Sequence, residues 1–120
     1  MGSRVNSADL ASVLSAYRVR YDSERQLQDR LAEIMSNAGI IYSREVRLTA
    51  KDRIDFMIED VGMEVKINMP TTGVIRQLYR YAQCAEVLDL VLVTSRAKHR
   101  EIPREIAGKP LHIVFLDGWL

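Results

Sequence analysis

The chain has little of several features that define specialised classes of protein. It contains one cysteine, Cys84, so no disulfide can form within it, and a reducing compartment is expected. Its two histidines, His99 and His112, are too few beside one cysteine for a structural zinc site. No apolar run approaches the roughly 20 residues that span a bilayer. These shortages exclude a disulfide scaffold, a zinc finger and a membrane-spanning helix.

The chain also has little excess of charge of either sign. Lys and Arg number 17 against 16 Asp and Glu, which gives a formal net charge of +1. Domains that bind nucleic acids are commonly basic, so this balance at first argues against such a partner. What the chain does have is 120 residues, 48% of them hydrophobic, enough for one globular domain with a core. We expect residues 1–6 to be a flexible terminus with a tag remnant, and no signal peptide.

Two helices are predicted in the first third of the chain. Leu10, Val13, Leu14 and Tyr17 have helical spacing and predict a helix over 7–19. A second helix is predicted over 24–38, because Ser23 and Gln26 form a capping box and Gly39 suits a helix end. Its buried stripe is predicted to comprise Leu27, Leu31, Ile34 and Met35.

Three strands are predicted next, over 40–48, 53–59 and 63–68. Alternation places Ile54, Phe56 and Ile58 together on one face of the second strand. Asp60-Val61-Gly62 is predicted to form a tight turn, with the glycine taking a positive φ. The last two strands therefore read as an antiparallel hairpin.

The remainder predicts an α/β fold with a mixed sheet flanked by helices. Residues 70–73 break the pattern, and a helix follows over 74–86. The continuous apolar run 87–94 is typical of a buried parallel strand. Residues 95–110 hold a basic loop with one turn of helix near 103–107, and 111–116 form the last strand. The inward face of the helix over 74–86 is predicted to comprise Ile75, Leu78, Tyr79 and Ala82.

Three charged residues interrupt the apolar pattern of the hairpin: Asp55, Glu64 and Lys66. Glu64 and Lys66 are two residues apart and so share a face, and the hairpin brings Asp55 beside them. Two close carboxylates suit Mg²⁺ or Mn²⁺, which prefer oxygen ligands. A lysine ammonium beside them can orient water and bind developing negative charge. The plainer alternative is a solvated sheet face with cross-strand ion pairs.

The same residues carry a resemblance to a known superfamily. Asp55, eight intervening residues and then Glu64-Val65-Lys66 resemble the D-x(n)-(D/E)-x-K signature of the PD-(D/E)XK nucleases, with Ile54 where the motif's proline stands. Glu24-Arg25 resembles the first-helix glutamate of Holliday-junction resolvases, and Gln77-x-x-x-Tyr81 resembles the superfamily's Q-x-x-x-Y element. The resemblance covers about 23–94 and looks closest to small stand-alone VRR-type nucleases and phage or archaeal resolvases.

This resemblance implies a restriction-endonuclease-like core (α-β-β-β-α-β) with 7–20 as an accessory helix. It implies that Asp55, Glu64 and the Val65 carbonyl are ligands of Mg²⁺ or Mn²⁺ and that Lys66 is catalytic. Glu24 would reach the metal through water, Gln77 would support the site or contact DNA, and Tyr81 would stack or hydrogen-bond beside it. Glu33 is a rival for the role of Glu24, but its place in mid-helix favours a surface position.

Local clusters of cations supply the DNA contacts that the implied function needs. Phosphate contacts depend on local cations and not on a basic total, so a net charge of +1 fits an acidic metal pocket with a basic rim. Binding is then expected to be modest, metal-dependent and sensitive to salt. The candidate DNA-binding residues are Arg53, Arg76, Arg80, Arg96, Lys98, Arg100 and Tyr81.

The sequence thus predicts a metal-dependent DNA nuclease that hydrolyses phosphodiester bonds, as an endonuclease on branched or structured DNA. The resemblance implies a homodimer in a prokaryotic cytoplasm, phage-encoded or cellular, and we expect the helix over 7–19 to dock on the partner copy. No membrane or nucleotide cofactor is expected. Two alternatives stay open: a DNA-binding or structure-sensing module without catalysis, and a protein-interaction domain on the same fold.

Overall fold

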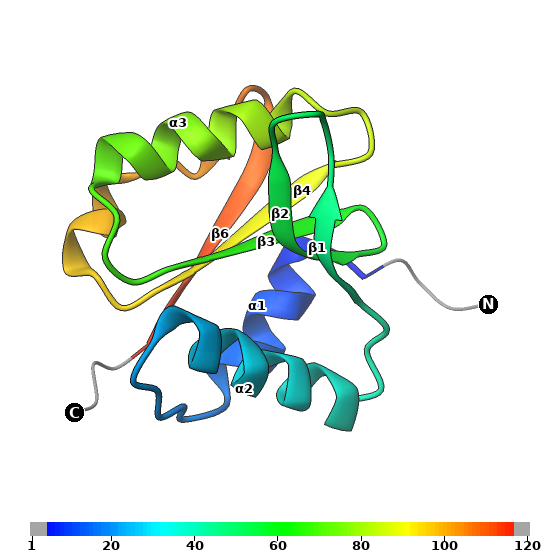
Figure 1. The fold of residues 1–120 in the computed structure, drawn as a ribbon, viewed down its shortest axis with the longest axis vertical. Helices are drawn as coiled ribbons and strands as arrows, with labels where there is room; N and C mark the ends of the chain where they lie inside the picture. The colour runs from blue at the N-terminus through cyan, green and yellow to red at the C-terminus, as the bar shows by residue number, and fades with distance from the viewer. Residues whose placement is uncertain (1–4, 117–120) are drawn as a thin grey trace.

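A mixed sheet of six strands organises residues 5–116, the part of the chain that the computed structural model describes (Figure 1). Its strand order is β1-β2-β3-β4-β6-β5. β1, β2 and β3 are antiparallel, β3, β4 and β6 are parallel, and β5 is antiparallel to β6. In chain order the elements are α1 (Ser7–Ser15), α2 (Glu24–Asn37), β1 (Ser43–Arg47), β2 (Arg53–Ile58), β3 (Val61–Lys66), α3 (Thr71–Ala82), β4 (Asp89–Thr94), the 3-10 helix η1 (Ala97–Glu101), β5 (Glu105–Ile106) and β6 (Lys109–Phe115).

The sheet separates two apolar cores. α1 and α2 cover one face, and α3 covers the other (Figure 1). Every residue of β4 is buried, which confirms the prediction of a central parallel strand with both faces covered. No helix among residues 5–116 is long and apolar enough to cross a bilayer.

α1 belongs to the core of its own chain, contrary to the expectation that it docks on a partner copy. It ends at Ser15, four residues earlier than predicted, and Leu10 and Leu14 are fully buried against α2 and the sheet. The Ser7 N–H donates to Asp89 Oδ2 over 2.9 Å, a carboxylate at a helix N-terminus. The Val5 N–H donates to a Glu59 carboxylate oxygen at 2.9 Å. Residues 5 and 6 are therefore anchored, while 1–4 lie outside the described residues.

α2 begins where its capping box predicts. Ser23 Oγ accepts the Gln26 N–H at 3.1 Å, and the Gln26 side chain accepts the Asp22 N–H. Gly39 has φ +76° just past the helix end, as expected for a glycine at that position. The cap fixes Glu24 in the first turn of α2, where it approaches the end of β3.

The turn between β2 and β3 differs from the prediction. Ile58 pairs with Val61, so the turn consists of Glu59 and Asp60, and Glu59 takes the positive φ of +53°. Gly62 lies inside β3 instead. A Cβ atom at this position would lie 2.6 Å from Cδ1 of Ile54. The glycine therefore leaves room for the Ile54 side chain in the core on the α3 side of the sheet.

α3 starts at Thr71, directly after Pro70, and not at 74. Proline suits the start of a helix, because its missing N–H would have no partner there. The buried residues are Val74, Leu78, Tyr81 and Ala82. The inward face is therefore rotated from the predicted one: Tyr79 is 54% exposed, whereas Tyr81 is fully buried.

The segment after β4 is more ordered than the predicted basic loop. Its helical turn lies at Ala97–Glu101, and the predicted turn near 103–107 is replaced by the short strand β5. His99 is fully buried and bonds Thr94 Oγ1 through Nδ1 at 2.6 Å and the Met69 carbonyl through Nε2 at 3.0 Å. This histidine ties η1 to the segment that joins β3 to α3.

Candidate functional site

The candidate site lies where β2 and β3 stop pairing through their backbones. The backbone pairing of the two strands runs from Ile58 opposite Val61 to Phe56 opposite Met63. At the next position, the Asp55 N–H donates to Glu64 Oε1 at 3.2 Å, and the Val65 N–H donates to Asp55 Oδ2 at 2.8 Å. Carboxylate oxygens therefore accept N–H groups of both strands here. The structure brings Asp55 and Glu64 together, as the hairpin pattern predicted.

The side chains of β1 and β2 change sides of the sheet at the level of Asp55. Ile54 lies in the α3-side core, whereas Phe56 and Ile58 lie in the α2-side core, so the predicted common face of these three residues is wrong. Opposite Asp55 in the β1–β2 register lies Glu45, with φ +53°. Such a φ is uncommon for a residue with a side chain and breaks the regular alternation of a strand. The Asp55 side chain at this point accepts the Val65 N–H of β3.

Lys66 and Glu24 complete a charged cluster at the end of β3. Lys66 Nζ lies 3.4 Å from Glu64 Oε2 and 4.0 Å from Glu24 Oε2. Glu24 Oε1 accepts the Ile67 N–H at 3.2 Å, so the first turn of α2 is bonded to the chain just past β3. The side chain of Glu64 is 2% exposed and that of Lys66 15%. The four residues predicted from the motif and from α2 therefore lie side by side.

Burial and mutual repulsion favour the protonated forms of the two central carboxyl groups. Burial raises the pKa of Asp55, against the opposing effects of the Val65 N–H and of Lys66. Burial, followed by repulsion from Asp55, raises the pKa of Glu64 to about 8, although Lys66 opposes the rise. One ammonium thus compensates two buried carboxyl groups incompletely. The pair is suited to hold an additional proton or a cation.

α3 carries Tyr81, which lies close enough to interact with both carboxyl groups, and the predicted residue Gln77. The Tyr81 hydroxyl donates to the Arg53 carbonyl at 3.1 Å, and burial raises the pKa of Tyr81 above its ordinary value. Tyr81 is fully buried, so its ring does not reach DNA, and of its two predicted roles, stacking and hydrogen bonding, the structure shows a hydrogen bond. Gln77 lies one turn earlier on the same helix, and its buried Oε1 has no hydrogen-bond partner among the described residues.

The acidic groups do not form a ready three-ligand metal centre. Within residues 5–116, no three side chains of His, Cys, Asp or Glu gather closely enough to hold a metal ion. Asp55 and Glu64 form a pair, and Lys66 lies within 4.0 Å of both Glu64 and Glu24. Glu33 is not a rival ligand, because it forms an exposed ion pair with Arg30 at 3.1 Å.

Two of the predicted DNA-binding residues lie near this cluster, on β2 and at the loop after β4. Arg53 follows directly on the β1–β2 turn, is 57% exposed and lies 3.9 Å from Glu45. Arg96 Nη1 donates to the Asn68 carbonyl at 3.0 Å, which places it beside the chain that leaves β3. Both are therefore close to the end of the strand that carries Glu64 and Lys66.

The other predicted cations are spread over α3 and η1. Arg80 donates to Asp52 at 2.8 Å and holds the pKa of that carboxyl below its usual value, so its charge is largely compensated. Arg100 lies over the Phe115 ring, 4.8 Å from its centroid. Arg76 and Lys98 are exposed. The basic rim is thus discontinuous, and Arg80 contributes less to it than predicted.

Sequence reasoning missed the unusual backbone of Glu45 and placed Tyr79 on the wrong face of α3. Glu45 sets the strand distortion opposite Asp55, but a glutamate in a strand carries no signal for a positive φ. Tyr79 is the exposed tyrosine of α3, next to Arg76 and Ile75, and only the helical phase separates it from Tyr81.

A scan against protein-family models and searches of the curated proteins and of the solved structures each return no match.

Proposed function

We propose that this protein is a small metal-dependent DNA nuclease built on a restriction-endonuclease-like core of the PD-(D/E)XK type. The observation that carries the proposal is the cluster of Asp55, Glu64, Lys66 and Glu24 at the parted ends of β2 and β3. The order α2-β1-β2-β3-α3-β4 agrees with the core that the motif implies. An ordinary solvated sheet face is a poorer explanation, because Glu64 is 2% exposed.

The donor set fits a divalent cation held by Asp55 and Glu64, with the Val65 carbonyl as a further ligand. Carboxylate and carbonyl oxygens are the ligands that Mg²⁺ and Mn²⁺ prefer. Burial raises the pKa of both carboxyl groups, and repulsion from Asp55 raises that of Glu64 further, so a bound cation would offset part of the cost of ionising them. When bound, such an ion lowers the pKa of water and neutralises charge on a phosphoryl oxygen.

The remaining residues of the cluster have distinct roles in this proposal. Hydrolysis joins the oxygen of water to phosphorus and releases the ester oxygen, which takes up a proton. The Lys66 ammonium orients the attacking water and stabilises the negative charge that develops on the phosphate. Glu24 holds Lys66 in place and is itself fixed by the Ile67 N–H. Gln77 on α3 keeps its predicted supporting role, with a buried side-chain oxygen that has no hydrogen-bond partner among the described residues.

The proposed substrate is DNA, contacted through Arg53, Arg76, Arg96 and neighbouring cations. Arg53 and Arg96 flank the end of β3, where they meet phosphates on either side of the bond to be cut. Preference for branched or structured DNA, and action as a homodimer with two sites, rest on the resemblance to junction resolvases alone.

The test is cleavage of linear duplex, nicked, single-stranded and four-way-junction DNA with Mg²⁺ or Mn²⁺. We expect Asp55→Asn, Glu64→Gln and Lys66→Met to reduce the rate at least about 100-fold, since each removes a charge at the reacting centre. Glu86→Gln, an exposed carboxylate away from the cluster, should leave the rate unchanged.

Each other outcome of this assay decides against the nuclease. No cleavage of any substrate by the wild type, or equal cleavage by the Glu64→Gln and Lys66→Met variants, contradicts the proposal. DNA binding without cleavage in either metal identifies a non-catalytic DNA-binding module. Absence of DNA binding even at low salt, where phosphate contacts are strongest, identifies a protein-interaction domain.

A further inference from the structure

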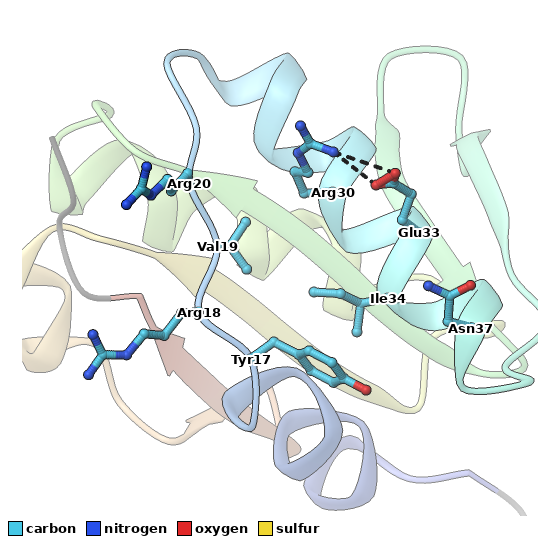
Figure 2. A pocket seen from close by; sticks show the side chains of 8 residues that line it. All are labelled: Tyr17, Arg18, Val19, Arg20, Arg30, Glu33, Ile34 and Asn37. Carbon is cyan, nitrogen blue, oxygen red and sulfur yellow. Dashed lines mark hydrogen bonds and ion pairs between the residues drawn. The ribbon is translucent and has the colours of Figure 1, made fainter.

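Two features outside the acidic cluster adjoin the elements that carry it: a groove on α2 and the buried histidine of η1. The groove has a volume of about 680 Å³ and lies between α2 and residues 17–20 (Figure 2). Its rim residues Arg30 and Glu33 pair with each other at 3.1 Å, and Arg18 and Arg20 point to the side away from α2. Among its described lining residues, the groove thus has no unpaired charge between its walls, whereas η1 is bonded directly to the chain that leaves β3.

The histidine of η1, His99, is fully buried, and both of its ring nitrogens have partners. Nδ1 lies 2.6 Å from Thr94 Oγ1, and Nε2 lies 3.0 Å from the Met69 carbonyl oxygen. Because a carbonyl only accepts, Nε2 carries the hydrogen of the neutral ring, and Nδ1 accepts from the Thr94 hydroxyl. Thr94 Oγ1 in turn accepts the Arg96 N–H at 3.1 Å. The two ring nitrogens and the hydroxyl are therefore all satisfied, which fixes the orientation of the ring.

The chain that follows Lys66 is held by side chains from α2 and from residues 96–99. Lys66 is the last residue of β3 and lies opposite Thr94 in the parallel register with β4. Beyond it, these side chains bond the backbone at three successive residues. The bonds join Glu24 to the Ile67 N–H at 3.2 Å, Arg96 to the Asn68 carbonyl at 3.0 Å and His99 to the Met69 carbonyl at 3.0 Å.

The position of this backbone influences where the Lys66 ammonium lies. A lysine side chain is a flexible stem of four carbons, so its charge is placed by its backbone and by its ion-pair partners. Nζ lies 3.4 Å from Glu64 Oε2 and 4.0 Å from Glu24 Oε2. Of the three side chains that hold 67–69, His99 alone is fully buried, whereas Arg96 and Glu24 are partly exposed. The bond from His99 is therefore the one that water cannot replace.

We propose that His99 is a positioning residue of the nuclease, which holds Lys66 beside Glu64 by fixing the backbone of 67–69. This inference rests on the proposed function, because it assigns His99 to the site where the phosphodiester bond is cut. His99 acts through the Met69 carbonyl, and Thr94 orients its ring for that bond.

Two amide side chains separate the two bonds of His99. The amide of glutamine ends near the position of Nε2 and can donate to the Met69 carbonyl, whereas that of asparagine ends near Nδ1 and reaches only Thr94. On the DNA that the wild type cuts, we expect His99→Asn to lower kcat about 10- to 100-fold with KM unchanged, and His99→Gln to stay within about threefold of the wild type. His112→Asn is the matched control at the other histidine, which bonds Ser7 at 2.9 Å, and should leave kcat unchanged.

Thr94 offers a second pair of variants that does not alter the histidine. Thr94→Val keeps the shape of the side chain but removes the hydroxyl that orients the ring, so kcat should fall several-fold, whereas Thr94→Ser keeps the hydroxyl and the rate. Amide hydrogen exchange at Ile67, measured by NMR in EDTA without DNA, reports on the segment itself. His99→Asn should speed this exchange at least about tenfold, and His99→Gln should not.

Equal losses of kcat in His99→Asn and His99→Gln, or losses that follow the fall in Tm, would show that His99 serves stability alone and would overturn the inference. If the wild type cuts DNA and the His99 and Thr94 variants cut equally well, the proposed function stands and this inference fails. If the wild type cuts no DNA, the proposed function fails, and with it the role of His99 in cleavage. The exchange rate at Ile67 then still decides whether His99 holds the segment 67–69.

Discussion

Glu64 is a carboxyl group that folding removes almost completely from water. Its nearest charges are Lys66, which stabilises the ionised form, and Asp55, which destabilises it. Burial dominates this balance and raises the pKa of Glu64 from 4.5 to about 8. Near neutral pH, therefore, the native protein without metal retains a proton at this position that the unfolded chain releases.

The consequence is a stability that falls as pH rises. Between about pH 4.5 and pH 8 the native state binds more protons than the unfolded state, so its free energy of unfolding decreases with pH, by at most about 1.4 kcal/mol per pH unit from one proton. Glutamine cannot titrate, so Glu64→Gln should flatten the profile. Urea unfolding in EDTA at pH 5, 6.5 and 8 measures how the free energy of unfolding depends on pH in the wild type and in Glu64→Gln. Equal slopes in the two proteins would contradict the raised pKa of Glu64.

Glu45 offers a second test at the residue scale, because its φ of +53° is sterically unfavourable for a residue that has a Cβ atom. Glycine adopts this conformation without steric cost, so we expect Glu45→Gly to leave the free energy of unfolding unchanged or to raise it by about 1 kcal/mol. Glu45→Val, a change that strand propensity favours, should lower it by about 1–2 kcal/mol. Thermal and urea unfolding compare the two. A more stable valine variant would show that the strand is regular here.

At the scale of elements, β2 and β3 pack closely at Gly62, where the absence of a side chain leaves room for the end of Ile54. A Cβ atom at Gly62 would lie 2.6 Å from Ile54 Cδ1 in a fully buried setting. We expect Gly62→Ala to cost about 1–3 kcal/mol and Ile54→Val, which removes that Cδ1, about 1 kcal/mol. The double variant should be more stable than the sum of the two losses indicates. Additive losses in urea unfolding would place the strain elsewhere.

At the scale of the whole molecule, α1 closes the core on the α2 side of the sheet. Leu14 is fully buried there, and the N-terminus of α1 is fixed to β4 through Asp89. Leu14→Ala should therefore lower the free energy of unfolding by about 2–5 kcal/mol. Because the loss lies within one chain, it should not depend on protein concentration. A loss that shrinks at high concentration would restore the docking role that the sequence suggested for this helix.

Patterns local in sequence predicted most of the elements and the residues of the cluster. The capping box fixed the start of α2, alternation identified β2 and β3, and an apolar run identified β4. Asp55, Glu64 and Lys66 stood out because they are charged residues inside apolar strands. Burying a charge costs free energy unless the charge is paired and hydrogen-bonded. Local patterns did not separate Tyr79 from Tyr81, since both fit a helical stripe and only packing against the sheet selects one.

The sequence by itself therefore determined the order of the longer helices and strands, but not of the short elements η1 and β5, and the type of charged group at each strand position. Only the tertiary structure decided how those groups meet: that Glu24 lies beside Lys66, that Glu45 takes a positive φ opposite Asp55, and that Gly62 makes room for Ile54. These depend on contacts between segments far apart in the chain, where no local periodicity acts. The groove along α2 has the same origin, because its two walls become neighbours only when the segment 17–20 packs against that helix.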